Sequence, residues 1–500
     1  MRSILTACLG AVFGIALMVM PDAAKARWLR AESPRFIVYT DGDERVLRDY
    51  VRQLEVFDWV LRSQTGLTSN DDGGGKLSIY LLGRRDDIDI VRPGLGSNVA
   101  GVYFPATEGI FAVSLRERRQ TTVLFHEYAH HFMHQHFAGA YPGWYVEGFA
   151  EFFSTVDISA RNITIGEHHR DRAGWLMSAN WISMEALLGS RQSEINHPDE
   201  RAAYYSMAWL LAHWFHSDPV RNRQLGAYLA AVAAGQDSVT AIQEATGLSL
   251  ATLERTLRSY LRGGLPYASG SVEGAPAPQV EVTTLPASAD DLLLLSLHLR
   301  VGRSEDDRDA SASAVRQAAA RHPTDPFARL TLAHAELHFG DPATGVRLLE
   351  ALVADYPTDT EALQYLALAY YEAAEDAERS ARINLLNQSN ALLAQALEID
   401  PDDYRTYLYL GRNREGTPGY PSQNDLAIWG AAYDLAPQLS GIRFGLGRAL
   451  MLSSRFDEAI VVLSPVANNP HGRDASIYAQ RLIELARARQ PPVPYEEDDT

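Results

Sequence analysis

Apolar and polar positions follow two different periodicities in the first half of the chain. Short apolar runs predict strands, and these runs occupy residues 36–39, 77–82, 99–104 and 109–115. Residues 46–61 instead carry apolar side chains every three or four positions, which predicts an amphipathic helix. The polar stretch 84–97, which contains Gly and Pro, is expected to be a loop. After residue 151 the pattern is mainly helical. Strands followed by helices predict an α+β domain.

The C-terminal half carries a repeat marked by proline. The prolines are Pro323, Pro357, Pro401, Pro437 and Pro470, spaced 34, 44, 36 and 33 residues apart. All but the last precede a helical pattern with small residues at its centre. Helix pairs of about 34 residues resemble tetratricopeptide repeats, which bury their apolar faces only by stacking. We therefore expect a separable all-α tetratricopeptide-repeat solenoid at 289–489, with an insertion near 375–384 that accounts for the longest interval.

Composition indicates where the folded units begin and end. Residues 264–288 are rich in Gly, Pro, Ser and Ala, which predicts a linker. Residues 490–500, QPPVPYEEDDT, are expected to be a disordered tail. These boundaries place the first folded domain at 27–263, because residues 1–26 have the organisation of a targeting segment.

Residues 1–26 resemble a signal peptide. Arg2 supplies a positive start, residues 4–20 form an apolar core, and Ala24-Lys25-Ala26 is a cleavage site. An uncleaved anchor is the alternative, but seventeen residues with two glycines are short for a membrane span. Cleavage would also remove Cys8, the single cysteine, so the mature chain could form no disulfide. These features predict an exported protein, periplasmic if the source is bacterial.

The stretch 126–151, HEYAHHFMHQHFAGAYPGWYVEGFAE, carries the candidate chemistry. It opens with His126, Glu127 and His130 in the arrangement His-Glu-x-x-His. On a helix the two histidines lie on one face, about 6 Å apart along the axis. This separation allows two ring nitrogens to bind one Zn²⁺, with Glu127 placed to act on a water molecule as general base.

A catalytic zinc site needs a third protein ligand and an open position. His136 has the spacing of the longer pattern HExxHxxGxxH, but Met133 replaces the helix-breaking Gly of that pattern. On an unbroken helix His136 would point about 80° away from His126. Glu147 follows a turn rich in Gly and Pro, on a second predicted helix that can cross the first, and is the better candidate. Glu151, one turn later, could orient a ligand imidazole.

HEYAH followed by PGWYVEGFAEFF resembles the gluzincin branch of zinc metallopeptidases, in particular the peptidase-MA-like domains with a W-x-x-E-G-x-A-E-[YF] motif. The resemblance covers roughly residues 28–215. It implies three zinc ligands and a general base, namely His126, His130 and Glu147 with Glu127. A downstream Tyr of this family commonly donates to the oxyanion, and Tyr205 with Trp209 matches its Tyr-x-x-x-Trp pattern. A core aromatic stripe is the alternative for these two residues.

The sequence therefore predicts an exported zinc-dependent metallopeptidase that hydrolyses peptide bonds, followed by repeats that recruit a protein partner or substrate. The strand near 110–114 could hold an extended substrate by β-augmentation. The alternative is a catalytically inactive periplasmic scaffold that binds metal and protein partners, and the presence of Glu127 favours the enzyme. The net charge of −18 argues against nucleic-acid binding. No membrane span is expected once the signal peptide is removed.

Overall fold

The computed structural model of the 500-residue chain describes most of its length. The described residues are 28–67, 74–96, 99–116, 121–137, 139–178, 180–189, 195, 197–301, 308–469 and 472–494. The predicted signal peptide, Pro470 and the end of the predicted tail lie outside them.

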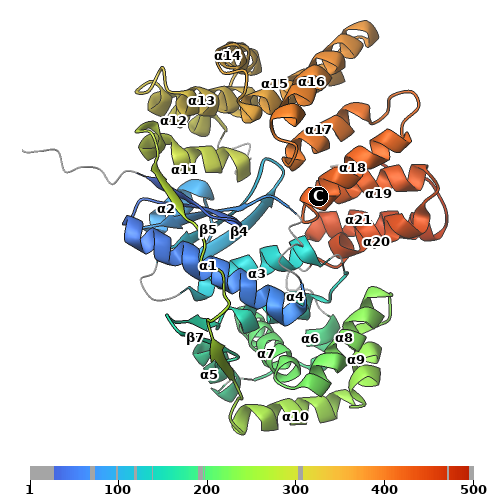
Figure 1. The fold of residues 1–500 in the computed structure, drawn as a ribbon. Helices are drawn as coiled ribbons and strands as arrows, with labels where there is room; N and C mark the ends of the chain where they lie inside the picture. The colour runs from blue at the N-terminus through green and yellow to red at the C-terminus, as the bar shows by residue number, and fades with distance from the viewer. Residues whose placement is uncertain are drawn as a thin grey trace, which may run out of the picture.

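A six-stranded mixed sheet forms the centre of the N-terminal part (Figure 1). Its strands in spatial order are β4 (Gly101–Ala106), β5 (Gly109–Leu115), β3 (Leu77–Leu82), β2 (Phe36–Thr40), β1 (Leu29–Glu32) and β9 (Glu281–Thr284). The pairs β2–β3 and β3–β5 are parallel, and the other pairs are antiparallel. The end strands are therefore β4 and β9.

The two faces of the sheet carry different helices. Alternate side chains of β3 enter two separate apolar cores, as the pleat of a strand requires. One core includes α1 (Glu44–Thr65) and α3 (Thr122–His136). The other includes α2 (Arg85–Val91) and α11 (Ser288–Val301). The stretch expected to be a loop thus contains α2, because Ile88 and Val91 lie on one helical face and are both buried against the sheet.

A mainly helical region follows α3 and is accompanied by a small second sheet. Its helices are α4 (Gly143–Phe153), α5 (Arg170–Ser178), α6 (Met184–Gly189), α7 (Pro198–His216), α8 (Pro219–Ala233), α9 (Ser238–Thr246) and α10 (Leu250–Arg262). The second sheet has the order β6 (Asp157–Ile158), β7 (Asn162–Ile165) and β8 (Ala268–Ser271). Helices α4 and α7 pack closely, because a Cβ on Gly148 would lie 2.6 Å from the Ala208 carbonyl oxygen.

The segment 264–288 is not a free linker. It contains β8, which pairs with β7, and β9, which pairs with β1 from Leu29↔Thr284 to Glu32↔Glu281. The β-branched residues of β9, sequence EVTT, suit an extended backbone. Their pairing also satisfies the backbone groups along the outer edge of β1. The segment therefore connects the two parts of the chain while extending both sheets.

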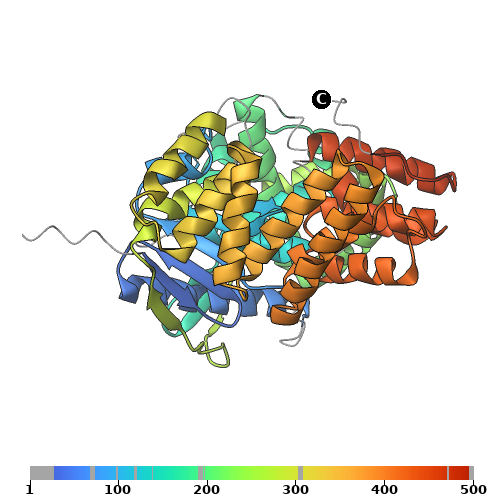
Figure 2. The ribbon, with the colours of Figure 1, turned by 90° about the horizontal axis from the view of Figure 1, so that it is seen from above.

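The C-terminal part is a succession of stacked helix pairs that Figure 2 shows from above. Its helices after α11 are α12 (Arg308–Ala319), α13 (Pro326–Phe339), α14 (Pro342–Asp355), α15 (Thr360–Glu375), α16 (Arg379–Ile399), α17 (Tyr404–Arg414), α18 (Gln423–Leu435), α19 (Ser440–Leu452), α20 (Phe456–Ala467) and α21 (Arg473–Arg487). Asp325, Asp359 and Asp403 cap three of them by accepting backbone N–H groups. The longest proline interval is explained by α16, which has 21 residues against 14 in α14.

The solenoid curves back onto the N-terminal part at more than one place. Tyr404 of α17 donates a hydrogen bond to the Thr107 carbonyl oxygen at the β4–β5 turn, over 3.1 Å. Farther along, the Asn468 amide donates to the Ala140 carbonyl oxygen between α3 and α4, over 3.4 Å. Within the described residues, none of the helices combines the length and the apolar character needed to cross a membrane.

Candidate metal centre

Helix α3 divides its side chains between a core and a polar site. Phe125, Ala129 and Phe132 are fully buried, and the Phe125 ring stacks on Phe57 of α1 with centroids 4.0 Å apart. This contact fixes the rotation of the helix about its axis. His126 and His130 consequently project from the opposite side, four residues apart on one face.

Helix α4 brings a carboxylate to the same point. The Nε2 atoms of His126 and His130 lie 3.1 Å apart. Oε2 of Glu147 lies 3.8 Å from the first and 3.6 Å from the second. The Glu147 side chain is only 1% exposed. Burial alone would lower the pKa of His130, but the negative charges of Glu147, Glu127 and Glu151 outweigh it and raise that pKa.

The three donor atoms fit a zinc ion. Tetrahedral zinc with bonds of about 2.0–2.2 Å holds its ligand atoms about 3.3–3.6 Å from one another. The three observed separations, 3.1, 3.6 and 3.8 Å, lie close to this range. Two imidazoles and one carboxylate are also a ligand set that catalytic zinc uses. His126, His130 and Glu147 are thus brought together as the sequence predicts, with zinc itself remaining a prediction.

Glu151 lies behind His126 and is held by an arginine. Its Oε1 is 3.7 Å from His126 Nδ1. Arg172 of α5 donates two hydrogen bonds to the Glu151 carboxylate, over 2.9 and 2.6 Å. Burial would raise the pKa of Glu151, but these hydrogen bonds and the nearby His126 lower it, so the carboxylate stays charged. His169 Nε2 lies 3.7 Å from the same carboxylate.

Glu127 faces the end strand of the large sheet. Its Oε2 accepts a hydrogen bond from the backbone N–H of Tyr103 in β4, over 2.9 Å. The strand that was expected to hold substrate, near 110–114, is β5, and both of its edges are already paired, with β3 and with β4. That expectation is wrong, because a strand inside a sheet offers no backbone groups for augmentation. The end strand beside Glu127 is β4.

Tyr205 of α7 lies close to the carboxylates of Glu147 and Glu151. Its ring is under the Arg172 guanidinium, 5.2 Å from ring centroid to Cζ. Burial raises the pKa of the Tyr205 hydroxyl, and the negative charges of Glu147 and Glu151 raise it further. The hydroxyl therefore keeps its proton at neutral pH. Trp209, the other half of the aromatic pair, is fully buried in the core.

The remaining histidines of α3 have other partners. The helix continues unbroken to His136, whose Nε2 lies 3.1 Å from Nη2 of Arg62. His131 contacts the Tyr103 hydroxyl through Nδ1 over 3.0 Å. Burial lowers the pKa of His131 to about 3, so this imidazole is neutral.

Sequence reasoning missed Arg172 and His169. Both come from the segment EHHRDR, residues 167–172, which follows β7. The only indication in the sequence that these residues have a role was the cluster of basic side chains after a strand. Nothing local indicated that it would meet Glu151, because that contact depends on the packing of α5 against α7.

Comparison with known proteins bears on the solenoid. Residues 326–370, covering α13, α14 and most of α15, match the family model described as tetratricopeptide repeat. Those residues form a tetratricopeptide repeat. The match confirms the repeat prediction for that segment, and the gluzincin resemblance of the N-terminal part stays a prediction.

Two solved structures align with part of the chain. One is TTC0263, a thermophilic TPR protein in Thermus thermophilus, which aligns over 40% of this chain and 100% of its own, with 22% identity and a TM-score of 0.35. Another is MamA MSR-1 C2, which aligns over 39% of this chain and 97% of its own, with 17% identity and a TM-score of 0.26. No curated protein matches the chain.

Proposed function

We propose that residues 27–263 form a zinc-dependent metallopeptidase that hydrolyses peptide bonds after export, in the periplasm if the source is bacterial. The observation that carries this proposal is the meeting of His126, His130 and Glu147 from two helices, with Glu127 beside them. The donor separations support zinc as the cofactor. Export rests on the sequence of residues 1–26.

Each polar group around the three donors has its own task in hydrolysis. A zinc ion held there would supply Lewis acidity, which polarises a peptide carbonyl and acidifies water. The Glu127 carboxylate would accept a proton from the attacking water and pass it to the leaving amine. The protonated Tyr205 hydroxyl would donate a hydrogen bond to the developing oxyanion. Glu151, held by Arg172, would keep the His126 ring oriented.

The repeats supply the second half of the proposal. Tetratricopeptide repeats indicate protein partners, so we assign to the solenoid the recruitment of a protein partner or of the substrate itself. The same match favours the second candidate function, a catalytically inactive periplasmic scaffold that binds metal and protein partners.

Replacing Glu127 by Gln separates the two functions. An amide cannot accept the proton, so cleavage of an unstructured protein is expected to fall by about 10²–10⁴-fold. Zinc content, measured by elemental mass spectrometry, should stay at the wild-type value because Glu127 is not among the ligands. Glu185→Gln, an exposed carboxylate in the first turn of α6, is the matched control and should change neither quantity.

Two results would contradict the proposal. Equal cleavage by Glu127→Gln and wild type would show that Glu127 is not the base. A zinc-loaded wild type that cleaves nothing across a broad peptide library would favour the scaffold.

A further inference from the structure

A groove of about 820 Å³ separates the end strand β4 from the solenoid. One wall is formed by residues 102–108 of β4 and the β4–β5 turn. The other wall comes from α11, α15 and α17, with Arg300, Glu372 and Tyr409 among the lining residues. At the β4–β5 turn Glu108 lines the groove, so the carboxylate there belongs to the N-terminal part while its neighbours belong to the solenoid.

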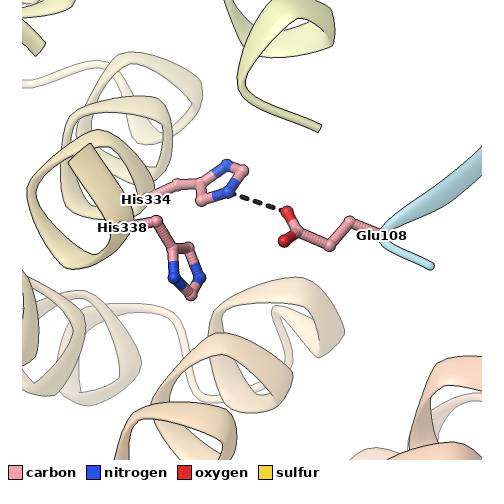
Figure 3. Close-up of side chains that lie close together, drawn as sticks. All are labelled: Glu108, His334 and His338. Carbon is pink, nitrogen blue, oxygen red and sulfur yellow. Dashed lines mark ion pairs between the residues drawn. The ribbon is translucent and has the colours of Figure 1, made fainter. Parts of the chain in front are cut away.

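Two histidines of α13 meet Glu108 at this place (Figure 3). His334 and His338 are four residues apart on one helical face, the same spacing as in the first site. Nε2 of His334 lies 2.8 Å from Oε2 of Glu108. Each of the three side chains offers one ligand atom within 4.8 Å of the others. Figure 3 shows the carboxylate and the two rings on opposite sides of one small space.

The cluster is buried, so its charges need compensation. The side chains of Glu108, His334 and His338 are 6%, 4% and 6% exposed. The Tyr365 ring stacks on His334 with centroids 4.4 Å apart, and its hydroxyl donates to Glu108 Oε2 over 3.3 Å. Tyr365 thus positions both His334, by ring stacking, and Glu108, by a hydrogen bond.

The neighbouring guanidinium groups bind other carboxylates. Arg300 lies beside Gly109, the residue after Glu108, because a Cβ added to Gly109 would be 3.2 Å from its guanidinium. This guanidinium forms an ion pair with Glu361 over 2.5 Å. Arg405 binds Glu361 over 3.3 Å and Asp403 over 2.7 Å. The charged groups around the cluster therefore form ion pairs with one another. The cluster itself consists of one carboxylate and two imidazoles.

We propose that Glu108, His334 and His338 form a second metal site, which binds a divalent transition-metal ion of the zinc class. Two imidazole nitrogens and one carboxylate oxygen are ligands that zinc prefers. The donor atoms lie within 4.8 Å of one another, and the pair formed by His334 and Glu108 is 2.8 Å apart, so small side-chain movements would bring the set to the roughly 3.3–3.6 Å that tetrahedral zinc requires. Glu372, whose Oε1 lies 3.9 Å from His338 Nδ1 and which lines the groove, or a water molecule from the groove completes the coordination.

Such an ion would tie two parts of the chain together. Glu108 stands on the β4–β5 turn, and both histidines stand on the helix that opens the matched repeat. Metal binding would hold the solenoid against the end strand and so fix the width of the groove. The proposal does not depend on peptidase activity, because its ligands are separate from those of the first site.

The test counts zinc in the untagged full-length chain. The protein is stripped with a chelator, reloaded with Zn²⁺, dialysed and analysed by elemental mass spectrometry. The double variant His126→Ala/Glu147→Ala removes the first site and should retain one equivalent per chain. Adding His334→Gln and His338→Gln should remove that equivalent. Adding Glu108→Gln instead should also remove it, which keeps the test valid should the histidine changes disturb α13.

A matched control comes from another histidine–carboxylate pair of the solenoid. His322 Nε2 lies 2.8 Å from Oδ2 of Asp291, and among the described residues this pair belongs to no group of three metal-ligating side chains. His322→Gln in the same background should keep the one equivalent. Circular dichroism confirms that each variant is folded. The proposal is overturned if the His126→Ala/Glu147→Ala variant binds no zinc, or if its bound zinc survives both the histidine changes and Glu108→Gln.

Discussion

Arg172 is the residue that keeps the Glu151 carboxylate charged and in place behind His126. Its two hydrogen bonds to Glu151 cross between α5 and α4. In Arg172→Gln the buried carboxylate would lose its strongest partner, and the His126 ring would be less well oriented. Removing a residue that orients a metal ligand in this way typically weakens metal binding by about 10–100-fold. Competition with a fluorescent zinc chelator measures this loss, and a variant with wild-type affinity would assign Arg172 a packing role only.

His216, at the end of α7, is expected to make the stability of the fold depend on pH in acid. Its ring stacks on Phe152 with centroids 5.0 Å apart, and its Nε2 is buried without a hydrogen-bond partner among the described residues. Burial lowers the pKa of His216 to about 4. The unfolded chain takes up this proton near pH 6.5, so the contribution to stability is complete above pH 6.5 and is lost as the pH falls toward 4.

The expected size of this effect is up to about 3 kcal/mol of unfolding free energy at pH 4. His216→Phe should remove that part of the pH dependence, as shown by urea unfolding at pH 7.5 and at pH 4.5. His168→Phe, at an exposed histidine, should leave the dependence unchanged. An unaltered acid response in His216→Phe would mean that other groups cause it.

At the scale of single residues, the helical periodicity of the sequence predicts the metal ligands but not the residues that orient them. The helical repeat alone places His126 and His130 on one face, and the turn after them allows Glu147 to return. Continuation of the helix through Met133 similarly keeps His136 away from the other two. Contacts such as Arg172 with Glu151 join elements that are separated in the chain, so no local pattern specifies them.

Helices α4 and α7 can approach only because position 148 has no side chain. In Gly148→Ala the new Cβ would meet the Ala208 carbonyl oxygen at 2.6 Å, and a backbone atom cannot move aside cheaply. The overpacking should cost about 1–3 kcal/mol despite the better helix propensity of Ala. Because α4 carries Glu147 and Glu151, zinc affinity should fall as well. Thermal unfolding and zinc titration measure the two effects.

Gly226→Ala provides the comparison, because nothing lies within 4 Å of the added Cβ on α8. That change should stabilise the protein by up to about 1 kcal/mol through propensity alone. If both glycine variants were equally stable, the contact between α4 and α7 would not be tight.

Helices and strands could be predicted where the apolar pattern fits only one type of secondary structure. The runs at β2, β3 and β5 and the helix α1 fall where the pattern predicts them. Several short elements did not, among them α2 and β9. Their identity comes from what they pack against, since Ile88 and Val91 are buried by the sheet and the backbone of β9 is completed by β1. The Gly and Pro residues of segment 264–288 lie mostly before, between and after its two strands, so the composition of the whole segment conceals them.

The solenoid is not a separate body joined by a tether. Its first helix, α11, shares a core with the central sheet, where Leu293 and Leu297 pack with Phe111 and Val113. Residues 289–489 were predicted to be separable because a repeat pattern suggests a segment that folds independently of the N-terminal part. The apolar face of α11 fits a repeat and a sheet equally well, so the sequence does not distinguish the two partners.

A fragment ending at residue 287 should therefore be less stable than one ending at 301. The shorter fragment leaves Phe111 and Val113 uncovered, whereas the longer one retains α11. Loss of a buried leucine typically costs about 2–5 kcal/mol, and α11 contributes two. We expect a lower melting temperature and strong binding of an apolar dye for the shorter fragment. Identical behaviour of the two fragments would show that α11 belongs to the solenoid alone.

The pairing of β9 with β1 also governs the order in which the protein can fold as it is made. Leu29 leaves the ribosome among the first described residues, but its partner Thr284 follows only after every helix from α1 to α10. Until then β1 is an open edge, able to pair with a neighbouring chain. A pause in synthesis or transport before residue 284 would lengthen this exposure, and the chain would gain its protected sheet only when the segment leading into the repeats arrives.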